Sequence, residues 1–93
     1  MNVESEMQAA VSELTKAGLV ARYMQQASPW IQGGTHSIDS SVGPVIKNTF
    51  GIEFENSSWI ARVPGEGQLQ NEQGFSNIDE AVRFVIKYFE SYK

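Results

Sequence analysis

Residues 35–39 hold the one cluster of side chains that suggests nucleophilic catalysis, with His36 next to Ser37 and close to Asp39. A hydrolytic triad needs a nucleophile, a base and an orienting acid brought together in space, and three near-adjacent residues are weak evidence for one. A metal site needs several His or carboxylate ligands at suitable spacing, whereas here one imidazole stands beside one carboxylate. The cluster therefore predicts a loop histidine, and we expect no catalytic residue and no metal site.

Two glycine-containing segments and a group of glutamates are the other candidates for chemistry. Gly33-Gly34-Thr35 and Gly65-Glu66-Gly67 lack the Lys-Ser/Thr sequence of a phosphate loop and the strand–loop–helix context of a dinucleotide site. Both segments indicate turns. Glu53 and Glu55 alternate with apolar residues, which predicts a solvated outer face of a strand. We therefore expect a protein that is no enzyme and carries no cofactor.

Length and composition limit the fold and the partners. Ninety-three residues, 41% of them hydrophobic, suffice for one domain spanning residues 1–93. The absence of cysteine excludes a disulfide scaffold, a thiolate nucleophile and a zinc site built on cysteine. The net charge of −4, with seven scattered basic residues, disfavours nucleic acid as a partner. The sequence shows no signal-peptide layout and no apolar run near the roughly 20 residues that span a bilayer, so we expect a cytoplasmic protein without membrane association.

Apolar spacing predicts a helix near each end of the sequence. Residues 3–17 carry apolar side chains at helical intervals, with Asn2 as N-cap and Gly18 at the left-handed position after the end. In the C-terminal segment, Ser76 and Asp79 resemble a capping box, and acidic residues precede basic ones as the helix dipole prefers.

Residues 45–63 give the clearest strand pattern, because Phe50, Ile52 and Phe54 alternate with polar or small residues. A loop with an even number of residues keeps these side chains on the same face as Trp59, Ala61 and Val63. With Ser57-Ser58 as the loop, Glu53 lies opposite Arg62; a four-residue loop is also allowed.

Three segments are less clearly patterned. Residues 19–27 favour a helix over a strand on composition. Residues 30–43 read as the longest irregular stretch, with a short strand near 35–41 as the alternative. Residues 68–70 suggest a short strand before a turn at 71–74. The sum is an α+β domain in which the N-terminal and C-terminal helices pack on one face of a small antiparallel sheet, a hairpin or meander.

The C-terminal helix carries more apolar surface than one sheet face covers, because its apolar arc spans about 200°. Val82, Val85 and Phe89 are expected to dock on the sheet, whereas Phe84 lies roughly 160° from Val82 on a helical wheel. Phe84 and Tyr88, extended by Tyr92, therefore form a candidate contact surface for a dimer or a partner. The alternative is that the chain covers these side chains itself.

A short stretch resembles the core of the HicB-type antitoxins, in which a hairpin and a Pro/Gly turn precede a Gly-x-Ser/Thr-x-x-Glu-Ala helix start. The matching residues are Val63-Pro64-Gly65 and residues 74–81, Gly-Phe-Ser-Asn-Ile-Asp-Glu-Ala. The resemblance amounts to a shared supersecondary unit. Helix–strand–strand–strand–helix is also the element order of double-stranded-RNA-binding domains, a function that the charge balance opposes.

These observations predict a small non-catalytic interaction or regulatory domain that acts as a homodimer through its C-terminal helix. Twenty-two Ser, Asn and Gln residues leave the surface weakly charged, which favours self-association. One alternative is an antitoxin-like or nucleic-acid-linked regulator whose acidic surface neutralises a basic partner. Another is a small-ligand-binding protein that uses the 30–43 loop, with Trp30, His36 and Asp39.

Overall fold

A computed structural model describes residues 2–41, 43–65 and 70–92. Within these ranges the chain forms two helices and seven strands. In chain order they are α1 (Val3–Lys16), β1 (Val20–Met24), β2 (Trp30–Gly34), β3 (His36–Ser40), β4 (Gly43–Lys47), β5 (Phe50–Glu55), β6 (Ser58–Pro64), β7 (Gln70–Phe75) and α2 (Ile78–Tyr92).

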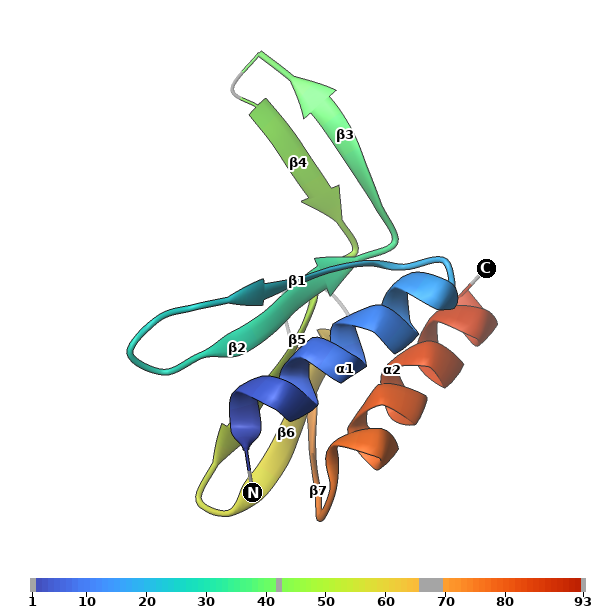
Figure 1. Ribbon diagram of the computed structural model, residues 1–93. Helices are drawn as coiled ribbons and strands as arrows, with labels where there is room; N and C mark the ends of the chain where they lie inside the picture. The colour runs from blue at the N-terminus through green and yellow to red at the C-terminus, as the bar shows by residue number, and fades with distance from the viewer. Residues whose placement is uncertain (1, 42, 66–69, 93) are drawn as a thin grey trace.

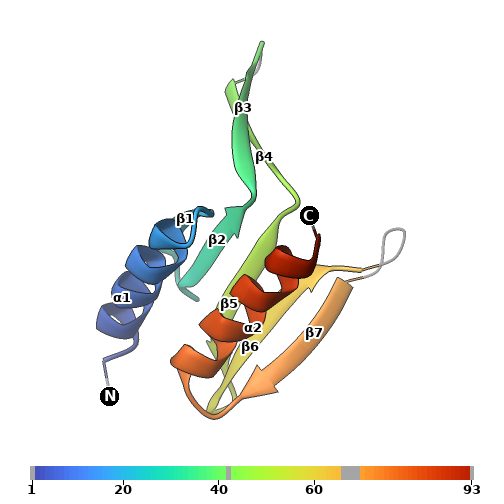
Figure 2. The same cartoon turned by 90° about the vertical axis from the view of Figure 1, so that its right-hand side faces the viewer.

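Five of these strands form one antiparallel sheet in the order β1-β2-β5-β6-β7, and both helices cover the same face of it (Figures 1 and 2). Ile31, Ile52 and Ala61 occupy one row across three neighbouring strands, and all three are fully buried under the helices. The predicted α+β architecture is confirmed. We call the opposite, helix-free side of the sheet the open face.

The first helix forms as predicted and ends one residue earlier. The Asn2 side chain accepts a hydrogen bond from the Ser5 backbone N–H at 3.0 Å, which caps the helix. Gly18 adopts a φ of +91°, the left-handed conformation that ends a helix at low cost for glycine. Met7 and Leu14 are fully buried on the face that meets the sheet and α2.

The helix favoured for residues 19–27 is wrong, because residues 20–24 form the edge strand β1. The chain reverses at Gly18, after α1, and enters β1. Five residue pairs join β1 to β2, from Val20–Gly34 to Met24–Trp30. Pairing with a neighbouring strand here outweighs the weak helical propensities of Leu, Ala, Arg and Met.

The irregular stretch expected for residues 30–43 is also wrong, and the alternative strand is the correct one. Gly33 of β2 pairs with Phe50 of β5. His36, three residues after Gly33, pairs with Lys47, three residues before Phe50. The β2–β5 pairing and the β3–β4 pairing therefore keep one register. β3 and β4 pair only with each other within the described residues, and they project from the body as an arm (Figures 1 and 2). Where the arm leaves the sheet, Asn48 Nδ2 donates a hydrogen bond to Thr35 Oγ1 at 3.0 Å.

The central hairpin forms with the predicted faces but a different register. Its loop is Asn56-Ser57, whose φ values of +51° and +63° fit a type I′ turn. Glu53 therefore lies opposite Ile60, so the predicted register is wrong by two residues, although Glu53 and Arg62 still form the expected ion pair as diagonal neighbours. Because a shift of two preserves the side-chain alternation, the apolar face is still buried.

The third strand of the meander lies later in the sequence than predicted. Residues 71–74, expected to form a turn, belong to β7, which pairs with β6 from Trp59–Phe75 to Pro64–Gln70. Residues 68 and 69 of the predicted strand lie outside the described residues. β7 is an edge strand of the sheet, since among the described strands only β6 pairs with it.

The second helix begins at Ile78, and its cap differs from the predicted one. Asn77 Oδ1 accepts a hydrogen bond from the Glu80 backbone N–H at 2.9 Å, so Asn77 and not Ser76 is the N-cap. Val82, Val85 and Phe89 dock in the core as the apolar spacing predicts.

Candidate functional site

One candidate surface lies at the β7 edge, where α2 leaves part of the sheet uncovered. Its side chains surround a shallow hollow of about 460 Å³, which we call the α2–β7 flank and which comprises Phe75, Glu80, Arg83, Phe84 and Lys87. The rings of Phe75 and Phe84 lie 5.4 Å apart at an angle of 49°, and both side chains stay half-buried. The flank therefore presents an aromatic pair at the margin of the molecule.

Charged residues of both signs surround this aromatic pair. Glu80, Arg83 and Lys87 are exposed, and the acidic residue precedes Phe84 along the helix whereas Lys87 follows it. Spacings of four and three residues place Glu80, Phe84 and Lys87 on one stripe of α2. The sequence pointed to Phe84 as part of a contact surface but did not assign these charged side chains to that surface.

The chain itself covers part of the predicted helix interface. Phe84 packs on β7, whereas the Tyr88 hydroxyl donates a hydrogen bond to the Pro64 carbonyl oxygen at 2.6 Å and its ring meets Phe89 edge-on. The two side chains therefore contact different strands rather than forming one patch. Tyr92 ends α2, and its side chain lies outside the described part. A partner contact by these residues stays a prediction.

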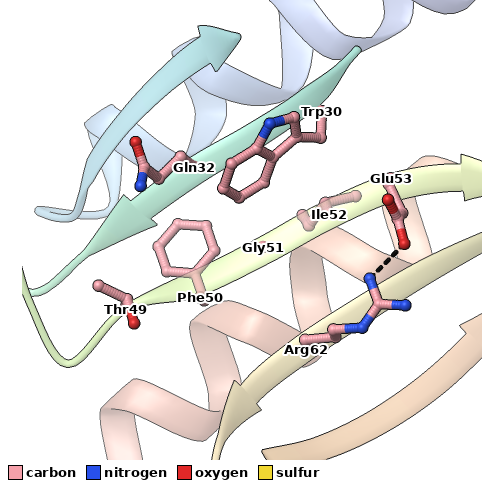
Figure 3. Close-up of a pocket in the computed structure, with 8 residues that line it drawn as sticks. All are labelled: Trp30, Gln32, Thr49, Phe50, Gly51, Ile52, Glu53 and Arg62. Carbon is pink, nitrogen blue, oxygen red and sulfur yellow. Dashed lines mark hydrogen bonds and ion pairs between the residues drawn. The ribbon is translucent and has the colours of Figure 1, made fainter. Parts of the chain in front are cut away.

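A second candidate surface is a hollow of about 240 Å³ on the open face, around Trp30. The indole leans from β2 over β5, because a Cβ atom at Gly51 would lie 3.4 Å from its Cε3 and Cζ3 atoms. Figure 3 shows the indole and Gln32 on β2, with Glu53 and Arg62 on the neighbouring strands. A flat ring, an amide and an ion pair suit a small polar ligand with one flat face.

Arg62 is held in place by two carboxylates. Its Nη1 donates to Glu53 Oε1, and its Nε donates to Glu72 Oε2 at 2.8 Å. The hydrogen bond with Glu53, and after it the one with Glu72, raises the pKa of Arg62 above its usual value although burial opposes this. Because the pKa of Arg62 is higher in the folded than in the unfolded chain, its charge stabilises the fold at every pH below the ordinary pKa of arginine. This stabilisation is lost only in strong alkali, so Arg62 stays charged at every pH of practical use.

The structure separates the three residues predicted to form a ligand loop. Trp30 lies on β2 in the body, whereas His36 and Asp39 lie on β3 of the arm, where they pair with Lys47 and Pro44. The side chains of His36 and Asp39 lie outside the described part. The hollow at Trp30 is lined instead by residues of β2, the start of β5 and β6, which the sequence did not group because their register was unknown.

Among the side chains described within residues 2–41, 43–65 and 70–92, no three of His, Asp or Glu are grouped so that they could hold a metal ion. In the same ranges, no helix has the length and apolarity to cross a membrane. Comparison with known proteins gives no match to any family model, any curated protein or any solved structure.

Proposed function

We propose that the protein is a small non-catalytic interaction domain that works as a homodimer through the α2–β7 flank. The observation that supports this most directly is the half-exposed pair Phe75–Phe84 at an edge of the sheet, within a ring of charges of both signs. Aromatic side chains at a margin are the typical core of a protein contact, and charges of both signs make such a surface complementary to itself.

Light scattering over a range of protein concentrations tests the dimer. We expect the wild-type protein to reach twice the monomer mass and Phe84→Glu to remain monomeric, because a carboxylate would be buried without a partner in the contact. Ile60→Glu is the matched control: Ile60 is half-buried as well, but it lies on the open face. Circular dichroism checks that both variants are folded.

A wild-type monomer at the highest accessible concentration contradicts the proposal. Dimers of Phe84→Glu as tight as those of the wild type contradict the assignment of the surface.

The hollow at Trp30 supports a second candidate function, the binding of a small neutral polar molecule. The probes are neutral mono- and disaccharides and nucleosides, followed by tryptophan fluorescence. Binding is expected to change the fluorescence of Trp30, and this change is expected to be absent in Trp30→Phe. The fluorescence of the fully buried Trp59 reports that the variant is folded. A panel without any saturable change excludes this candidate.

A further inference from the structure

The two edge strands of the sheet differ in their protection against a further strand. In β1 the exposed Arg22 lies at the centre of the strand, and α1 packs against this strand. β7 is exposed at four successive residues, 71–74, and its one charge there, Glu72, is bonded to Arg62 of β6. Charged side chains at an edge hinder strand addition. Because Glu72 is bonded to Arg62 within the sheet, β7 is less protected than β1 and is the edge that can accept a partner strand.

A second copy of the chain is the partner that this edge fits. α2 follows β7 after a short turn and runs back along β6 and β7 (Figure 2). A two-fold axis perpendicular to the sheet beside β7 pairs β7 with its copy in antiparallel orientation. The same axis places the two α2 helices on one side of the joined sheet, antiparallel and with their flanks facing each other.

Two charges of the flank, those of Glu80 and Lys87, complement a reversed copy of themselves. Glu80 and Lys87 are seven residues apart, which is about 10 Å along the helix axis and too far for a direct ion pair within one chain. Phe84 lies between them. When an antiparallel copy is centred near Phe84, Glu80 of each copy comes opposite Lys87 of the other. A parallel copy would instead juxtapose like charges.

We propose that two copies join through β7 into one continuous ten-stranded antiparallel sheet, with Phe84 at the centre of the contact and reciprocal Glu80–Lys87 ion pairs around it. This architecture rests on the proposed homodimer and specifies which elements form it.

Charge reversal tests the ion pairs. Glu80→Lys and Lys87→Glu are each expected to weaken the dimer about tenfold or more, since both place like charges opposite each other twice per dimer. The double variant Glu80→Lys/Lys87→Glu is expected to regain the wild-type affinity within about threefold, because the pairs reform with reversed sign. Analytical ultracentrifugation gives the dissociation constants, and Arg22→Glu on the opposite edge is the matched control.

Cysteine crosslinking tests the strand pairing independently of the charges. The natural chain has no cysteine, so single cysteines at positions 71–74 form a disulfide only with a second copy. A residue next to the two-fold axis meets its own copy at about 5 Å, which a disulfide spans. We expect rapid oxidation to a covalent dimer for one or two of these four variants, and none for Arg22→Cys.

The outcomes separate the two proposals. Rescue by the double variant together with crosslinking at 71–74 supports the joined sheet. A stable dimer without rescue and without crosslinks overturns the joined sheet and leaves the homodimer. A protein that is monomeric throughout overturns both.

Discussion

At the start of α2, a single hydrogen bond distinguishes Asn77 from its neighbour Ser76. Asn77 Oδ1 accepts from the Glu80 backbone N–H, one of the donors that a helix leaves unpaired at its N-terminus. Ser76 is exposed and lies one residue before the cap. Asn2 caps α1 in the same way, because its Oδ1 accepts a hydrogen bond from the backbone N–H of Ser5, three residues later. Both helices are therefore capped by an asparagine.

Replacing Asn77 and Ser76 one at a time shows which of the two residues caps α2. Asn77→Ala is expected to lower the free energy of unfolding by about 1 kcal/mol, because it removes the only side-chain acceptor of the Glu80 N–H within the described residues. Ser76→Ala is expected to change it by less than about 0.5 kcal/mol, as at an ordinary surface position. Urea denaturation measures both, and equal losses would mean that Ser76 shares the capping role.

At the scale of the elements, close contact between β1, β2 and the core depends on one glycine. Gly33 pairs with Ala21 and Phe50 on its two neighbours, and a Cβ atom there would overlap the Val20 carbonyl oxygen and the Phe50 ring. Gly74 in β7 differs, because a Cβ atom would meet the end of Ile60 at 3.5 Å, an ordinary contact. The twin glycines at 33 and 34, which suggest a turn in the sequence, instead lie within β2.

The two glycines give a matched pair of stability variants. Gly33→Ala is expected to cost about 2 kcal/mol, because the backbone oxygen of Val20 cannot move without disturbing the β1–β2 pairing. Gly74→Ala is expected to have little effect or to stabilise the strand slightly. Thermal unfolding at one protein concentration compares them; a loss at Gly74 as large as that at Gly33 would contradict the packing described for β2.

At the scale of the whole molecule, the arm extends the protein to 39 Å along its longest dimension, against 26 and 25 Å along the others. β3 and β4 form a separate two-stranded sheet, and such a hairpin alone has marginal stability in water. Among the side chains that the structure describes, the buried core residues all lie on the helices and on β2, β5 and β6. The body is therefore expected to fold without the arm.

Removal of the arm tests this independence. Because the register continues through the arm, residues 35–48 can be replaced by an Asn-Gly turn between Gly34 and Thr49 without a shift of β2 against β5. The shortened chain should unfold cooperatively, with a loss of less than about 1 kcal/mol. If it collapses into a molten state, the arm contributes to the core packing.

Some elements could be predicted from the sequence because the evidence for them is local. The N-terminal helix with Asn2 and Gly18, the apolar stripe of the C-terminal helix and the alternation from Phe50 to Val63 all follow from spacing, because a buried face repeats with the period of its element. The α+β class follows from these three elements.

Other elements could not be predicted, because they depend on contacts between residues far apart in the sequence. β1 has a helical composition and becomes a strand because β2 offers it a pairing edge, and residues 36–40 lie among turn formers yet pair with residues 43–47. The register of the central hairpin depended on the positive φ values of Asn56 and Ser57, which the apolar pattern does not report. The two candidate surfaces likewise needed the strand order, because the α2–β7 flank and the Trp30 hollow join residues that only the sheet brings together.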